Sequence, residues 1–109
     1  MTVADIAQKM GLNEVCTGGN LFREVTGCYI GDLLSLVMSR AQSGDAWITI
    51  QTNVNVPAVA ALGDVAMVIV AEGMELDENA KKRASQEGIC VYRSPKSAFE
   101  LAVEIKECL

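Results

Sequence analysis

Side chains that could carry acid–base or nucleophilic chemistry are few in this sequence. None of its 109 residues is a histidine, and this absence removes the commonest general base and every imidazole metal ligand. Cys28 and Asp32 flank a short glycine-containing turn, so a small enzyme would have to use one of them. No base accompanies the thiol, and a small core residue is its alternative role. We therefore expect no catalytic residues.

The cysteines show no C-x-x-C pair, which speaks against a zinc or iron–sulfur site. Such scattered thiols are typical of the reducing cytoplasm. We expect neither a metal nor a cofactor. The four positions are Cys16, Cys28, Cys90 and Cys108.

Phosphate-binding signatures are also missing. Neither G-x-x-x-x-G-K-[ST] nor G-x-G-x-x-G occurs, and residues 27–31 form only a loose glycine-flanked loop. Such a loop is interpreted as a turn leading from a strand into a helix, in preference to a phosphate cradle. The isolated chain is therefore expected to lack kinase and ATPase activity.

Charge and composition limit the partners. The net charge of −5, with 9 basic against 14 acidic residues, argues against nucleic acid, which needs a basic surface. The N-terminus lacks a signal-peptide pattern, and the longest apolar run, residues 65–71, is too short to cross a membrane. We expect a cytoplasmic protein with no membrane partner. Because 50% of so short a chain is hydrophobic, we expect one domain over residues 1–109 that forms a homodimer.

Helix and strand patterns alternate along the chain. After a first helix capped by Thr2 and ended by Gly11, two strands precede three helix–strand units and a last helix opened by Ser94 and Pro95. The expected strands are residues 14–16, 23–29, 46–52, 65–71 and 89–92. The expected helices are residues 3–10, 32–42, one that is capped by Asn53 or Asn55 and ends just before Gly63, 77–86, and one after residue 95.

This order predicts right-handed crossovers and a three-layer α/β/α domain with a mainly parallel central sheet. Residues 65–71 are apolar throughout, as expected of a strand covered on both faces, so we place them at the centre. The basic triplet Lys81, Lys82 and Arg83 follows acidic residues in its helix and is interpreted as a solvated face.

Three predicted strands lead into helices at residues 29–32, 52–55 and 93–97, and these turns must emerge on one edge of a parallel sheet. Helix N-termini there offer N–H groups to a small anion or a nucleotide, and the Arg93 guanidinium could hold a carboxylate or phosphate. An equal alternative is that Asn53, Asn55, Ser94 and Ser97 only cap helices. The candidate ligand-binding residues are Tyr29, Asp32, Thr52, Asn53, Glu72, Arg93 and Ser94.

Residues 23–29, 30–38 and 44–52 together resemble a DRTGG domain over nearly the whole chain. Thr26-Gly27-Cys28-Tyr29 stands where the small stand-alone members have T-G-G-Y, and Thr52-Asn53 stands where the family has its D-R pair. The resemblance implies a fold similar to the N-terminal domain of HPr kinase/phosphorylase. It also implies a regulatory role beside other domains, without kinase chemistry.

Three functional hypotheses follow from these observations. The leading one is a non-catalytic regulatory or ligand-sensing domain that binds a small anion or nucleotide. The alternative is a protein-interaction subunit without a small-molecule ligand, because the chain is unusually apolar. A small enzyme using Cys28 or Asp32 is the third.

Overall fold

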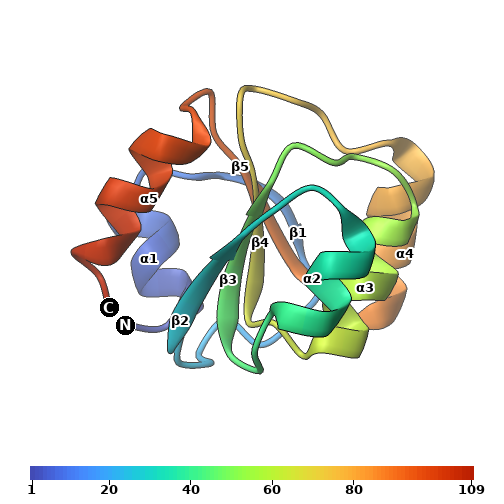
Figure 1. The fold of residues 1–109 in the computed structure, drawn as a ribbon, viewed down its shortest axis with the longest axis horizontal. Helices are drawn as coiled ribbons and strands as arrows, with labels where there is room; N and C mark the ends of the chain where they lie inside the picture. Colours follow the sequence, from blue (N-terminus) through green and yellow to red (C-terminus); the bar gives the residue numbers. More distant parts are fainter.

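The computed structural model describes all 109 residues and contains one five-stranded sheet between two layers of helices (Figure 1). The strands lie in the order β1-β5-β4-β3-β2, with β1 antiparallel to β5 and every other pair parallel. This confirms the mainly parallel α/β/α fold. The strands are β1 (Asn13–Thr17), β2 (Gly27–Ile30), β3 (Asp45–Thr49), β4 (Met67–Val70) and β5 (Cys90–Arg93).

Five helices cover the two faces of the sheet. α1 and α5 pack on one face, and α2, α3 and α4 pack side by side on the other (Figure 1). The three crossovers between β2 and β5 all step in the same direction along the sheet, and right-handed connections then place α2 to α4 on one face. The helices are α1 (Val3–Lys9), α2 (Leu34–Arg40), α3 (Asn55–Gly63), α4 (Glu78–Glu87) and α5 (Ala98–Lys106).

β4 occupies the middle of the sheet, as its uninterrupted apolar sequence predicts. Met67 and Ile69 point into the core beneath α1 and α5, whereas Val68 and Val70 point into the core beneath α2 to α4. All four side chains are fully buried. A strand covered on both faces needs apolar residues at every position, which is why no alternation appears here.

Several predicted boundaries differ from the structure for identifiable reasons. β3 ends at Thr49, three residues early, because the Ile50 N–H donates to the Asp32 carboxylate outside the ladder. β2 begins only at Gly27, because the residues before it pair with the N-terminus instead of with β3. The Val25 N–H donates a hydrogen bond to the Met1 carbonyl. Both strands are therefore shorter than the β-forming composition of their segments predicts.

Helix ends also shift. α5 begins at Ala98 behind a capping box of Ser97 and Glu100, and so later than the predicted start at Ser94–Pro95. Ser94 instead extends the sheet, donating its N–H to the Val70 carbonyl. α3 includes Gly63, because Asp64 takes the left-handed C-cap conformation at φ 54°. The Thr2–Asp5 capping box of α1 confirms its predicted start. No helix is long and apolar enough to span a membrane.

Asp64 is held in that conformation by Arg23. The guanidinium donates to both carboxylate oxygens, at 2.8 and 3.0 Å, and to the Asp64 carbonyl at 2.9 Å. Ser43 adds a hydroxyl hydrogen bond. The bonds from Arg23 and Ser43 lower the pKa of Asp64 from 3.8 to about 2. One ion-paired carboxylate thus joins the segment before β2, the turn before β3 and the end of α3.

The clamp should make stability depend on acid pH. A carboxyl group whose pKa is lower in the folded state stabilises the fold above its unfolded pKa, and this contribution is lost as pH falls towards 2. We expect Arg23→Gln to lower the melting temperature near neutral pH. The gap to wild type should narrow from about pH 5 to about pH 2. A gap that stays constant across thermal melts in this range would contradict the role given to the ion pair.

Candidate functional site

The carboxyl ends of the four parallel strands β2 to β5 lie on one edge of the sheet, as predicted. The turns at this edge form two separate groups, one after β2 and β3 and one after β4 and β5. The connections from β2 to β5 all step in the same direction along the sheet, so the strand order does not reverse between them. The sheet therefore lacks the crevice at a reversal of strand order where doubly wound folds bind ligands. The site must therefore be sought within one group.

Asp32 joins the turns after β2 and β3. Its Oδ1 accepts a hydrogen bond from the buried Thr49 hydroxyl and another from the Ile50 N–H, both at 2.8 Å. The Gln51 side-chain amide donates to the Asp32 carbonyl at 2.9 Å. These bonds occupy one carboxylate oxygen, so Asp32 positions the two turns.

Asn53 organises the entry to α3. Its Oδ1 accepts from the Asn55 N–H at 2.9 Å, and its amide nitrogen donates to Gln51 at 3.3 Å. The carbonyl of Thr52 accepts from the N–H of Asp77, which ties this turn to the start of α4. Tyr29 is half-buried and packs against the core beneath α2 and α3. All four sequence-predicted residues of the first group thus have local structural contacts.

Arg93, Ser94 and Glu72 belong to the second group. The Arg93 guanidinium donates to the Gly73 carbonyl at 2.6 Å, and the Gly73 N–H donates to the Ser94 carbonyl at 2.9 Å. Ser94 is buried, and its hydroxyl accepts from the Lys96 N–H. Glu72 is exposed at φ 61°, and its N–H donates to the Lys96 carbonyl. The turns after β4 and β5 are therefore held together, with Arg93 between them.

A polar cavity of about 160 Å³ opens beside Arg93, between β1 and α4. β1 runs antiparallel to β5, so its first residues reach the carboxyl end of that strand. Two cations, Arg93 and Lys81, line this cavity, and their acidic neighbours Glu75 and Glu78 have side chains 73% and 83% exposed. The lining residues are Glu14, Val15, Glu75, Leu76, Lys81 and Arg93.

The lining pairs two cations, Arg93 and Lys81, with two carboxylates, Glu14 and Glu75, so an anion would have to displace a carboxylate to bind. The Arg93 fork lies 3.7 Å from Glu75, and the Lys81 ammonium donates to Glu78 at 3.1 Å. Exposed ion pairs of this kind contribute little, so an entering phosphate or carboxylate can replace either partner. The pocket thus offers one ligand both the planar guanidinium of Arg93 and the ammonium group of Lys81.

Sequence reasoning found Arg93 but missed Lys81. The basic triplet was interpreted as wholly solvated, whereas Lys81 is half-buried and Lys82 and Arg83 are exposed. A usable signal was present, because a helix that follows a parallel strand starts at the carboxyl edge. Lys81 lies in the first turn of α4, so it belongs to that edge.

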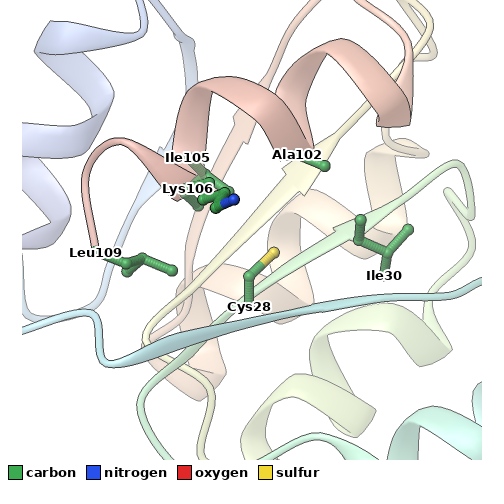
Figure 2. A pocket seen from close by; sticks show the side chains of 6 residues that line it. All are labelled: Cys28, Ile30, Ala102, Ile105, Lys106 and Leu109. Carbon is green, nitrogen blue, oxygen red and sulfur yellow. The ribbon is translucent and has the colours of Figure 1, made fainter.

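A second cavity, about 290 Å³, is apolar and lies between β2 and α5 (Figure 2). Cys28 is in its wall, and burial together with nearby Asp45 raises the pKa of this thiol to about 11. Near neutral pH it is protonated, which argues against the enzyme hypothesis based on Cys28. Nowhere do three His, Cys, Asp or Glu side chains gather closely enough to hold a metal ion.

No protein-family model matches this sequence, and no curated protein matches it. A similar solved structure is the crystal structure of the CBS and DRTGG domains of the regulatory region of Clostridium perfringens pyrophosphatase, complexed with the activator diadenosine tetraphosphate. The TM-score is 0.79 over 99% of this chain, with 14% identity, and the chain covers 47% of that structure's chain. At this identity the likeness shows the fold alone, which is related to that of a regulatory region.

Proposed function

We propose that this protein is a non-catalytic regulatory domain of the DRTGG type that senses a small anion in the pocket between Arg93 and Lys81. The observation that carries the proposal is the pairing of these two cations in one cavity at the carboxyl edge. The related fold of a regulatory region complexed with a nucleotide activator supports it. The free thiols are compatible with a cytoplasmic setting.

The size of the cavity limits what it takes. At about 160 Å³ it is smaller than the roughly 300–1,000 Å³ of sites that enclose a drug-sized ligand. It accommodates a phosphate or carboxylate group, so a nucleotide would place one phosphate here and leave its base outside. Arg93 and Lys81 would bind the anionic group, and Glu75 would be displaced.

Arg93 also connects the pocket to the loop between β4 and α4. Its guanidinium binds the Gly73 carbonyl in the loop between β4 and α4. An anion that draws the guanidinium towards Lys81 competes with this bond and with Glu75. The loop and the first turn of α4 are therefore where a bound ligand would change the surface presented to a partner.

Binding should raise the melting temperature. A ligand at one hundred times its dissociation constant stabilises the native state by about 2.7 kcal/mol, a shift on the order of 10 °C for a domain of this size. We expect such shifts with inorganic phosphate, pyrophosphate or diadenosine tetraphosphate in thermal melts. Lys81→Gln and Arg93→Gln should each abolish most of the shift.

Lys82→Gln is the matched control, because it removes the same charge from the neighbouring exposed position on α4. It should leave the ligand-induced shift unchanged. The proposal is wrong if none of the three anions stabilises the protein at millimolar concentration. It is also wrong if Lys82→Gln reduces the shift as much as Lys81→Gln does.

The second candidate function is a protein-interaction subunit without a small-molecule ligand. Exposed large apolar side chains on α2 and α5 favour it, including Leu36, Met38 and Phe99. We propose that the chain also forms a homodimer. The exposed apolar surface of these helices is larger than a small monomeric domain usually leaves in contact with water. Association without any anion response would favour this second function.

A further inference from the structure

The two edge strands of the sheet differ in how they are protected. β1 carries Glu14 and a register irregularity between Glu14 and Cys16, and α4 packs beside it. Charges and bulges of this kind prevent an edge strand from pairing with another chain. β2, Gly27–Ile30, pairs only with β3, has a regular register and carries no charged residue. The β2 edge is open to a further strand.

The helical layers show the same asymmetry. α2 is the end helix of its layer on the β2 side, and it exposes Leu36 and Met38. On the other face α5 lies over β2 and β3 and exposes Phe99 and Val103. At the opposite end of the sheet, α4 exposes no large apolar side chain, and neither does α1. The two helices that lie nearest β2 therefore carry exposed apolar side chains, whereas α4 at the far end of the sheet carries none.

The apolar groove between β2 and α5 opens at this end. Cys28 and Ile30 project from β2 towards α5, where Ala102 and Lys106 form the facing wall (Figure 2). Because side chains alternate along a strand, Tyr29 points to the other face, towards the core beneath α2 and α3. The edge strand thus presents apolar or aromatic groups on both faces.

We propose that the β2 end is the interface with a second copy of this chain, in which the two β2 strands pair antiparallel about a twofold axis at Tyr29. A single extended peptide would cover the sheet layer and leave the exposed residues of α2 and α5 in water. A second copy brings all three layers, so α5 meets α5 and α2 meets α2.

The twofold arrangement is self-complementary in register. With Tyr29 opposite its own copy, Cys28 lies directly opposite the second copy's Ile30 on the α5 face. The two tyrosines form an aromatic cross-strand pair on the other face. The two sheets of five strands each become one continuous sheet. This surface is at the opposite end of the sheet from the Arg93 pocket, so either proposal can fail without the other.

Light scattering after size-exclusion chromatography tests the interface. At high micromolar concentration the wild type should have twice the 11.6 kDa mass of one chain. Ile30→Lys and Ala102→Glu, which place a charge on the two walls of the groove, should each give the single-chain mass, with unchanged circular dichroism. Leu62→Glu, on an α3 residue that is 74% exposed away from this end, should remain dimeric. The interface rests on the homodimer proposed above, so a monomeric wild type would overturn both. A dimer that survives both interface variants would overturn this interface alone.

Cross-linking tests the register. Directly opposite residues of an antiparallel pair have Cα atoms about 4.5–5.5 Å apart, within the range for a disulfide. Ile30→Cys should therefore form an intermolecular disulfide with native Cys28 under copper–phenanthroline oxidation, seen as a dimer on a non-reducing gel. The added change Cys28→Ser should remove it, and Leu62→Cys should give none. A dimer that cross-links equally well without Cys28 would overturn the assigned register.

Discussion

Replacing Trp47 with alanine is expected to destabilise the protein by about 3–5 kcal/mol, the usual range for deleting a fully buried large aromatic side chain. Trp47 is the largest fully buried side chain of the core beneath α2 to α4. Its indole N–H also donates to the Gly31 carbonyl at 2.9 Å. The substitution leaves a cavity and removes the donor that fixes the end of β2.

Because small domains have only about 5–15 kcal/mol of stability, Trp47→Ala should lose a large share of it and unfold at a clearly lower urea concentration than wild type. Urea denaturation followed by circular dichroism measures this, since the variant lacks the only tryptophan. Trp47→Phe keeps most of the side-chain volume but loses the hydrogen bond to Gly31. Its free energy of unfolding should therefore lie between those of the wild type and Trp47→Ala. A loss below 1 kcal/mol for Trp47→Ala would contradict the packing described here.

Asp32→Ala is expected to lower stability by about 1–3 kcal/mol, because it leaves the buried Thr49 hydroxyl and the Ile50 N–H without their acceptor. The turns after β2 and β3 would separate. Asp32→Asn keeps an acceptor oxygen and should recover most of the loss. Chemical denaturation of the three proteins gives the comparison.

The same pair of variants separates a structural role from a binding role. Asp32 is an exposed residue at the carboxyl edge, and the sequence alone favoured it as a ligand contact. We expect Asp32→Ala to leave the phosphate-induced shift in melting temperature unchanged while lowering the melting temperature itself. The opposite result, normal stability with no response to phosphate, would move the binding site from Arg93 to the first group of turns.

Local sequence patterns determined the order of elements and the position of the central strand. Residues 65–71 could only be a strand covered on both faces, and the structure places β4 in the middle. The Thr2 cap of α1 and the position of α4, predicted at residues 77–86 and found at Glu78–Glu87, were also readable, because they depend on contacts within a few residues. The exact ends of β3 and α5 were not, since they depend on Asp32 and on the ladder to Val70.

What only the tertiary structure decided is which polar residues share a site and which apolar residues stay exposed. Lys81 meets Arg93 because the antiparallel β1 and the start of α4 enclose the end of β5, and no local pattern encodes that neighbourhood. Likewise, α5 buries Leu101 and Ile105 and leaves Phe99 exposed. In α2, Val37 is buried but Met38 stays exposed, because burial depends on where the helix lies along the sheet. Periodicity fixes which residues share a face of one element. Contacts between distant elements decide whether that face is covered.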